Sequence, residues 1–176
     1  MQVVSPRAPS RLIVLLALLS SCGGALPEQA HVRRVVDGDT IELQDGRLVR
    51  YIGIDTPEVR RKDGTHWVVD PEPFAEAATE ANRRLVEGQT VRLVYDVQTH
   101  DRFGRLLAYV YVPDGRGERM VNAELVRQGF AQPLTIPPNV RSAELFRTLA
   151  AEARRERRGL WADEGCPERV EGCDGR

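Results

Sequence analysis

The sequence predicts a small β-barrel with attached helices, an α+β fold. Five segments rich in Val, Ile, Leu or Tyr are bounded by Gly, Asp or Pro, which is typical of short strands. They cover residues 32–36, 40–44, 47–54, 90–97 and 105–112. One helical segment separates the third strand from the fourth, and three strands, a helix and two strands form the order of a five-stranded OB-fold. Such barrels often bind oligonucleotides, although a fold alone does not establish a function.

The length and composition of the chain allow one domain. Its 176 residues are 41% hydrophobic and 29% charged, which suffices for a single core with a short appendage. We expect four parts: a signal peptide over residues 1–21, a tether over 22–30, the barrel domain with its helices over 31–161 and a polar tail over 162–176.

The N-terminus has the order of a secretory signal peptide. MQVVSPRAPSR carries two arginines and no acid, and it precedes the apolar run LIVLLALL, which is too short to span a membrane as a stable helix. The segment Leu19-Ser20-Ser21-Cys22 is similar to the lipobox of bacterial lipoproteins, which implies that Cys22 becomes the lipidated first residue. We therefore expect a lipid anchor in the cell envelope, at the outer membrane because Gly23 rather than an acid follows Cys22. The alternatives are a secreted protein cleaved near Ala25 and an N-terminus buried in the fold.

The charge balance is unusual for a protein that binds nucleic acid. The chain has 25 Lys and Arg against 26 Asp and Glu, and removal of residues 1–21 takes away two arginines and no acid, so that the net charge moves from −1 to −3. Affinity for nucleic acid comes largely from cations placed on phosphates. Binding therefore depends on arginines that gather locally, and we expect it to be weak and sensitive to salt.

Three helices are expected beside the barrel. The first covers PFAEAATEANRRLVEG, from Pro73 to Gly88, and its apolar face consists of Phe74, Ala77, Ala78, Ala81 and Leu85. The second covers residues 121–128 and ends at Gly129. The third covers residues 142–158, and its apolar face consists of Leu145, Phe146, Leu149, Ala150 and Ala153.

A basic run ends the third helix. Arg154, Arg155, Arg157 and Arg158 precede Gly159, and we interpret them as a solvated last turn that complements the helix dipole, with a phosphate-binding patch as the alternative. Leu160 and Trp161 are expected to pack back on the body of the domain.

Acidic and basic residues gather between residues 35 and 58. Asp37, Asp39, Asp55 and Glu58 lie beside strand-like runs, and Arg50 lies between them. Hard cations such as calcium prefer several oxygen ligands, and carboxylates beside a guanidinium suit metal-assisted phosphoryl transfer. The stretch is therefore the candidate site of the molecule.

Each part of this stretch also has a purely structural interpretation. Asp37-Gly38 alone is a turn signal, and Asp55-Thr56-Pro57-Glu58 is similar to the start of a helix. The segment that follows, VRRKDGTHWVVDPEP, has no helical apolar period and contains Gly64, Pro71 and Pro73, so we expect a loop there. The acidic cluster then lies at the entrance to a loop and needs a partner.

The stretch resembles the micrococcal nuclease (thermonuclease) family, whose members carry an Asp-Gly-Asp-Thr turn, an arginine and an Asp-Thr-Pro-Glu loop in this order. DRFGRLLAYVYV at 101–112 resembles the second active-site segment of the family, and MVNAELVRQGFAQ at 120–132 resembles its next helix. The resemblance covers residues 32–161. It implies a calcium-dependent endonuclease that cuts DNA and RNA and leaves 3′-phosphate ends.

The resemblance also implies a role for each site residue. Asp39 and Asp55 are implied calcium ligands, with the main-chain carbonyl of Thr56 as a third oxygen and water completing the shell. Glu58 matches the position that orients or deprotonates the attacking water. Arg50 and Arg105 match the two arginines that contact the phosphate. Thr40 is an outer-shell residue at most.

The sequence departs from the family where substrate is held. The family has tyrosines in its nucleotide pocket after the second helix, and this chain has Thr135 and Pro137 at those offsets. Stacking of a base on an aromatic ring contributes about 1–3 kcal/mol, so we expect weaker substrate binding with the catalytic set intact. Tyr109, four residues after Arg105, is a candidate pocket wall, and a core tyrosine is the alternative.

Two expectations concern the tail and the partners. Cys166 and Cys173 are expected to form a local disulfide, because a translocated protein lies in a compartment that permits disulfides and no histidine or further cysteine for a metal site lies nearby. The expected partners are DNA and RNA as substrates and a membrane through the lipid anchor, with no obligate protein partner implied. The alternative function is a non-catalytic OB-type lipoprotein that binds nucleic acid, for which the acids have no use.

Overall fold

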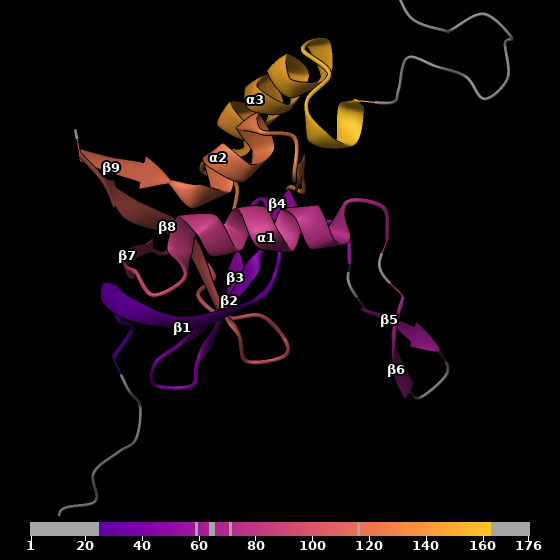
Figure 1. Ribbon diagram of the computed structural model, residues 1–176. Helices are drawn as coiled ribbons and strands as arrows, with labels where there is room; N and C mark the ends of the chain where they lie inside the picture. The colour runs from indigo at the N-terminus through magenta and orange to yellow at the C-terminus, as the bar shows by residue number, and fades with distance from the viewer. Residues whose placement is uncertain (1–24, 59, 64–65, 71, 116, 163–176) are drawn as a thin grey trace, which may run out of the picture.

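The computed structural model describes residues 25–58, 60–63, 66–70, 72–115 and 117–162 (Figure 1). Five strands close into a barrel, which confirms the predicted fold. They are β1 (Gln29–Asp37), β2 (Thr40–Leu43), β3 (Leu48–Tyr51), β7 (Thr90–Val94) and β8 (Leu106–Asp114). The strands pair antiparallel in the order β3-β2-β1-β7-β8, and a parallel pair between β3 and β8 closes the barrel. A further strand, β9 (Gly117–Met120), extends the sheet beyond β8.

The predicted third strand, 47–54, is wrong in its extent. β3 ends at Tyr51, and the chain turns at Gly53, whose φ of 81° favours glycine. A Cβ at Gly53 would also lie 2.5 Å from a ring carbon of Phe146, so the turn needs glycine for space as well. The chain continues as β4 (Ile54–Asp55), which pairs with β10 (Gln132–Pro133) outside the barrel. The break re-aims the chain and places Asp55 at a sheet end.

The segment expected to be a loop contains a β-hairpin. β5 (Arg60–Asp63) pairs antiparallel with β6 (His66–Val69), and Asp63 is the register partner of His66. In Figure 1 this hairpin stands away from the barrel. The loop prediction is wrong because the absence of a helical period does not exclude strands, and Asp63-Gly64 is a hairpin signal followed by the strand-forming run His66–Val69.

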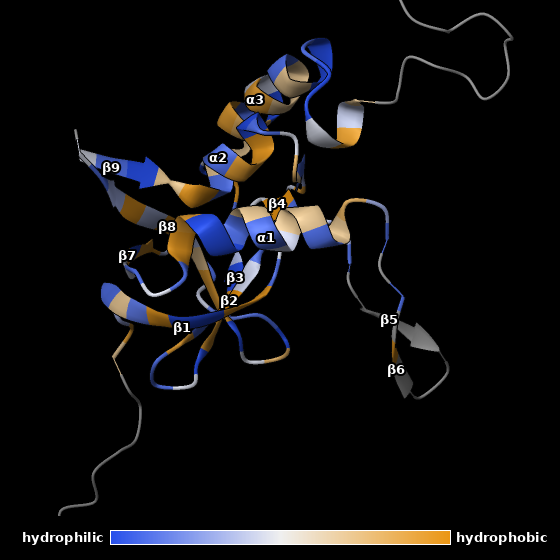
Figure 2. Cartoon of the chain, viewed as in Figure 1, coloured by the Kyte–Doolittle hydropathy of each residue, from blue (hydrophilic) through white to orange (hydrophobic). Residues whose placement is uncertain are grey.

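The three expected helices are present. They are α1 (Ala75–Val86), α2 (Val121–Arg127) and α3 (Ala143–Arg155), followed by the short 3-10 helix η1 (Gly159–Trp161). α1 packs against β1 and α2, and α2 packs against α3. In Figure 2 hydrophobic colours gather on α2 and α3, where these two helices meet. No helix among the described residues is long and apolar enough to cross a membrane.

The buried faces of α1 and α3 differ in part from the predicted ones. α1 buries Ala75, Ala78, Ala81, Asn82 and Val86, whereas Phe74 and Ala77 are exposed. Phe74 precedes the helix with a φ of 69°, which turns it out of the predicted stripe. α3 buries Phe146, Leu149 and Ala153, and Leu145 is exposed. Helical periodicity locates the apolar side of a helix to within about one residue, and tertiary packing selects the residue.

The end of the domain packs back on the body, as expected. Trp161 is buried, and the guanidinium of Arg154 lies 4.1 Å from the centre of its ring. Arg158 donates to the carbonyl of Arg127 and pairs with Glu156. These contacts support the structural interpretation of the basic run over a phosphate-binding patch.

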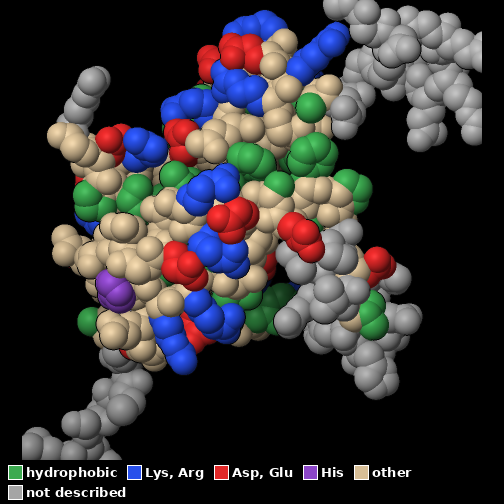
Figure 3. Space-filling model, in the orientation of Figure 1, with side chains coloured by type: hydrophobic (Ala, Val, Ile, Leu, Met, Phe, Trp, Pro, Cys, Tyr) green, Lys and Arg blue, Asp and Glu red, His purple; other side chains and the backbone are tan. Residues whose placement is uncertain are grey.

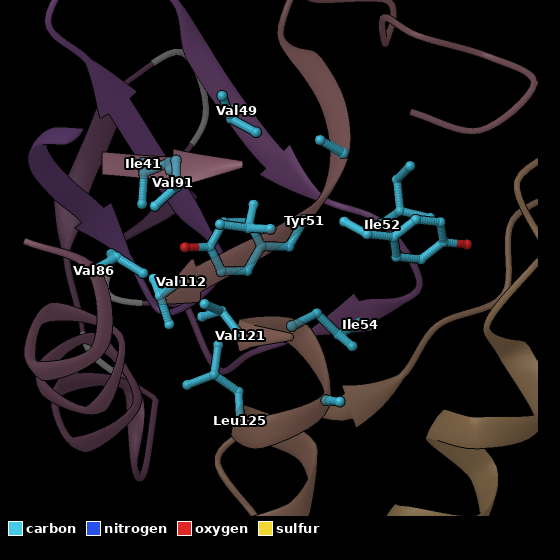
Figure 4. Packing of buried hydrophobic residues seen from close by; sticks show 14 of the residues in the cluster. Ile41, Val49, Tyr51, Ile52, Ile54, Val86, Val91, Val112, Val121 and Leu125 are labelled. Carbon is cyan, nitrogen blue, oxygen red and sulfur yellow. The ribbon is translucent and has the colours of Figure 1, made fainter. Parts of the chain in front are cut away.

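The core fills the barrel and the space between the barrel and the helices. Figure 4 shows part of this cluster, in which residues of β2, β3, β7 and β8 meet residues of α1 and α2. Side chains from one side of each strand point into the barrel, so alternate residues are free to face outward. The barrel is thus a rigid support for the strand ends and turns that carry the candidate site.

Candidate active site

One arginine joins two of the predicted carboxylates. Arg50 lies on β3 opposite Thr40 of β2, which places its side chain beside Asp39 in the β1–β2 turn. Its guanidinium forms an ion pair with Asp39 Oδ1 through one terminal nitrogen and with Asp55 Oδ1, at 2.6 Å, through the other. Three residues from three segments therefore meet at one point.

Asp39 is the most firmly held of these groups. Its side chain is 3% exposed, and Oδ2 accepts hydrogen bonds from the backbone N–H of Thr56 at 3.0 Å and from Thr56 Oγ1 at 3.1 Å. Thr40 Oγ1 donates to Asp39 Oδ1 at 3.2 Å, which agrees with an outer-shell role. A Cβ on Gly38 would lie 2.6 Å from Thr56 Oγ1, so the close approach of the two loops requires glycine at this position.

Glu58 lies at the base of the β5–β6 hairpin. Its carbonyl accepts a hydrogen bond from the N–H of Glu72 at 3.0 Å, and its own N–H donates to Glu72 Oε2 at 3.1 Å. The pKa of the Glu58 carboxyl is raised, mainly by partial burial and next by the negative charge of Asp37, while the positive charge of Arg50 opposes both. A carboxylate with a raised pKa is a stronger base, which suits proton transfer from water.

Asp37 is a further carboxylate of this group, and sequence motifs assigned it no separate role. Burial raises its pKa, while a hydrogen bond with Thr40 and the charges of Arg50 and Arg105 lower it. Its Oδ1 accepts a hydrogen bond from the backbone N–H of Asp39 at 3.1 Å. For both Asp37 and Glu58, burial is the largest cause of the raised pKa, and the positive charge of Arg50 opposes it.

Arg105 lies in the loop that leads into β8, close enough for its charge to affect Asp37. Its Nε donates to Asp101 Oδ2 at 2.6 Å, and the backbone N–H groups of Arg105 and Phe103 donate to Asp101 Oδ1 at 3.0 and 2.9 Å. Burial raises the pKa of Asp101, but these hydrogen bonds outweigh it and hold the pKa below its usual value. Asp101 thus stays ionised and positions the second predicted arginine.

A cavity of about 480 Å³ adjoins the acidic group. Arg50 and Arg105 both line it, whereas Asp39, Asp55 and Glu58 do not. The rest of its wall includes Phe103, which is 68% exposed, and the apolar Leu134 and Ile136. The two arginines therefore lie between the carboxylates and a largely apolar pocket.

Sequence reasoning missed these apolar residues of the pocket. It compared Thr135 and Pro137 with the tyrosines of the family, but the side chains that line the cavity belong to their neighbours Leu134 and Ile136. A phenylalanine between two arginines, Phe103 in the turn before β8, was the available signal. Where the family has tyrosines, this pocket therefore offers the side chains of Phe103, Leu134 and Ile136, among other apolar residues.

The structure places Tyr109 in the core, so its prediction as a pocket wall is wrong. It is 1% exposed and does not line the cavity. Its hydroxyl donates to Asp96 Oδ2 at 3.1 Å and accepts from the N–H of Ser142 at 3.3 Å, and its ring packs 6.2 Å from that of Phe146. Tyr109 lies on a β8 position whose side chain points into the molecule, which is the alternative that the sequence left open.

The donor set fits a hard cation. Asp39 and Asp55 already converge on one positive group, Arg50, and nearby Asp37 and Glu58 carry raised pKa values that added positive charge would lower. The described residues contain no cluster of three Asp, Glu, His or Cys side chains arranged to hold a metal ion. Calcium accepts main-chain carbonyls and water beside carboxylates, so two aspartates and the Thr56 carbonyl can form part of its shell.

Three predicted residues lie outside the described residues. They are Cys22, the expected lipidation site, and Cys166 and Cys173, the expected disulfide pair. Their roles stay predictions.

The fold and the site together define a small barrel protein whose acids and arginines are arranged for chemistry on phosphate. Comparison with known proteins narrows this class of protein to one family. The family model described as "Staphylococcal nuclease homologue" matches residues 48–163, which include Arg50, Asp55, Glu58 and Arg105. This chain belongs to the staphylococcal nuclease family.

Individual relatives match over a larger part of the chain. The thermonuclease of Staphylococcus intermedius is 36% identical over 133 residues, which cover 74% of each chain. The thermonuclease of Staphylococcus hyicus is 34% identical over 135 residues, 75% of each chain. An uncharacterized endonuclease of Escherichia coli is 37% identical over 135 residues, which cover 75% of this chain and 76% of its own.

Proposed function

We propose that this protein is a calcium-dependent endonuclease that hydrolyses phosphodiester bonds in DNA and RNA. The observation that carries the proposal is the guanidinium of Arg50, which bridges Asp39 and Asp55 at the edge of a cavity that Arg105 also lines. The thermonuclease and endonuclease relatives support the same reaction class.

The two arginines act on the phosphate. A phosphodiester is anionic, and charge gathers on its non-bridging oxygens as water attacks. Arg50 and Arg105 present planar sets of N–H donors that match these oxygens. Asp101 holds Arg105, and Asp39 with Asp55 holds Arg50, so both guanidinium groups are kept at the edge of the cavity.

Glu58 acts on the water. The Glu58 carboxylate, whose pKa is raised, accepts or orients the proton of the attacking water. The oxygen of this water forms the new bond to phosphorus. The bond between phosphorus and the 5′ oxygen of the following nucleotide breaks, and this oxygen takes up a proton from solvent. The products therefore carry a 3′-phosphate and a 5′-hydroxyl. In this scheme Glu58 is the base and the arginines stabilise the charge.

Calcium is the proposed cofactor. Asp39, Asp55 and the carbonyl of Thr56 would hold it, and the bound ion would supply positive charge to a phosphate oxygen and to the attacking water. Thr56 is well placed for this role, because its N–H and hydroxyl both bond to Asp39 and fix the orientation of the loop.

The surface agrees with weak, local binding of nucleic acid. On the face shown in Figure 3, Lys and Arg side chains are interspersed with Asp and Glu, and many arginines elsewhere are paired, such as Arg92 with Glu118. Substrate contacts are thus concentrated at the cavity, where Phe103, Leu134 and Ile136 offer apolar surface for a base.

Circular single-stranded DNA tests the proposal, because only an endonuclease can open a circle. We expect the purified protein to linearise it with calcium and to stop when a chelator is added. Polymerase extension from the products should require prior removal of the 3′-phosphate. The matched control is Asp39→Asn, which keeps the shape of the side chain and removes its charge.

Equal cleavage with and without chelator would overturn the calcium requirement. Binding of the circle without any cleavage would instead support a non-catalytic binding protein.

A further inference from the structure

A buried pair of side chains links helix α1 to the turn that carries Asp37 and Asp39. Asn82 of α1 is 0% exposed, and its Nδ2 donates to the backbone carbonyl of Asp37 at 3.0 Å. Its Oδ1 accepts a hydrogen bond from the hydroxyl of Tyr51 at 2.9 Å. Tyr51 is the residue directly after Arg50 on β3 and is 2% exposed. Asn82 is thus held between the tyrosine and the turn.

The same tyrosine also holds the other side of the turn. The backbone N–H of Tyr51 donates to the carbonyl of Asp39 at 2.9 Å. The carbonyls on both sides of Gly38 are therefore bonded either to Tyr51 itself or to Asn82, which Tyr51 orients. Figure 4 shows the Tyr51 ring inside the core cluster, with its hydroxyl on the side of Val86 of α1.

We propose that Tyr51 and Asn82 are positioning residues for the nuclease reaction, and that they hold the Asp37-Gly38-Asp39 turn so that the Asp39 carboxylate stays aimed at the cation and at Arg50. The inference rests on the proposed function. Both side chains are buried, and both side-chain hydrogen bonds run toward the turn rather than toward the cavity.

The contacts of Asp39 explain why such support is needed. The Asp39 side chain pairs with Arg50 of β3 and bonds to Thr56 in the loop after β4, but none of these side-chain contacts fixes the backbone of the turn. Asn82 is instead part of a helix of twelve residues that packs against β1. Its bond to Asp37 ties the turn to a rigid element, and groups that orient metal ligands in this way typically contribute about 10–100-fold in metal affinity or activity.

A second buried asparagine provides a matched control. Asn122 of α2 is also 0% exposed and also makes two bonds, from its Nδ2 to the carbonyl of Ile52 and to its Oδ1 from the N–H of Val110, both at 2.9 Å. Neither of these two bonds involves the Asp37-Gly38-Asp39 turn. Likewise, Tyr95 donates its hydroxyl to the carbonyl of Pro27 at 2.8 Å, outside the aspartate turn, and serves as the control for Tyr51.

The test compares Asn82→Ala and Tyr51→Phe with Asn122→Ala and Tyr95→Phe in the full protein. Each variant is measured for kcat and KM on single-stranded DNA, for calcium affinity by titration calorimetry, and for unfolding temperature. We expect Asn82→Ala and Tyr51→Phe to lower kcat and calcium affinity by about 10–100-fold with KM for DNA little changed. The controls should lose thermal stability in the same way and keep kcat and calcium affinity.

A double variant shows whether Tyr51 and Asn82 act together or independently on kcat. If Tyr51 acts through Asn82, then Tyr51→Phe combined with Asn82→Ala should be no worse in kcat than Asn82→Ala alone. Tyr51→Phe removes one oxygen and keeps the packed ring, so it remains informative if Asn82→Ala does not fold.

The outcomes separate this inference from the function on which it rests. A wild-type protein that cuts DNA, with kcat and calcium affinity unchanged in Tyr51→Phe and Asn82→Ala, would overturn the positioning role alone. Equal losses of kcat in the Asn122→Ala and Tyr95→Phe controls would also overturn it, because the effect would then be general destabilisation. A wild-type protein with no calcium-dependent cleavage would overturn the proposed function first.

Discussion

Arg50 has two tasks that draw on the same guanidinium. Its ion pairs with Asp39 and Asp55 use both terminal nitrogens, and its place on the cavity wall exposes it to substrate. A planar fork with five N–H donors can serve two carboxylates and a phosphate, whereas a lysine has a single charged nitrogen. Position 50 therefore needs the planar guanidinium of arginine, and the positive charge of a lysine would not replace it.

Glu58→Gln should lower turnover far more than calcium affinity. The amide cannot accept the proton of water, yet Glu58 is not one of the proposed calcium ligands. In the wild type, kcat should fall at low pH, because the Glu58 carboxylate takes up a proton and ceases to be a base. Burial and the negative charge of Asp37 raise the pKa of Glu58, and bound calcium would act against this rise. A pH series of kcat for both proteins checks this, and an unchanged acid limb in Glu58→Gln would assign the base to another group.

Arg105→Ala should nearly abolish activity and leave the protein folded. Loss of one preorganised donor at a developing charge typically lowers the rate by about 10²–10³. Arg92→Ala is the matched control. Like Arg105, Arg92 pairs with a carboxylate, but it lies on β7 and does not line the cavity. Near-normal cleavage by Arg105→Ala would mean that the second phosphate-binding group lies elsewhere.

At the scale of elements, the β5–β6 hairpin brings local positive charge to an acidic chain. Residues 60–63 read Arg-Arg-Lys-Asp, and the hairpin begins two residues after Glu58. Its base is closed by the backbone bond between Glu58 and Glu72. The residue types of the hairpin therefore predict that it adds to phosphate binding.

Replacement of Arg60, Arg61 and Lys62 by glutamine should raise KM and leave kcat nearly unchanged. The slope of log KM against log salt should also become shallower, by about 0.7 for each phosphate of a single strand that no cation of the hairpin neutralises any longer. The control replaces Arg147, Arg155 and Arg157, which removes the same charge from exposed positions on α3 and the residues after it. Identical effects from both sets would show that only total charge matters.

For the whole molecule, the N-terminal segment predicts where the protein works. Leu19 to Cys22 favours a lipid anchor, and each buried CH₂ of an acyl chain contributes about 0.8 kcal/mol to membrane binding. Cys22→Ala should therefore move the protein from the membrane fraction to the soluble fraction of the cell envelope. Unchanged membrane association, or a native N-terminus beyond Cys22, would exclude the anchor.

The sequence by itself determined the order of the five barrel strands and the three helices. Local signals suffice there, because β-branched runs, turn residues and helical periodicity act over a few residues. The same local character explains the errors. β3 ends at Tyr51 because the chain turns at Gly53, where Phe146 of the distant helix α3 leaves no space for a side chain. The hairpin after Glu58 was missed because the lack of a helical period was interpreted as a loop.

The tertiary structure decided how the site is assembled. Sequence motifs named Asp39, Arg50, Asp55, Glu58 and Arg105, but only the closed barrel shows that one guanidinium joins the two aspartates. The structure also shows that Tyr109 is buried in the core and that Leu134 and Ile136 line the cavity. A motif shows which residue types are present, and these indicate the chemistry. Burial and contacts depend on segments far apart in the chain, which only the packed fold brings together.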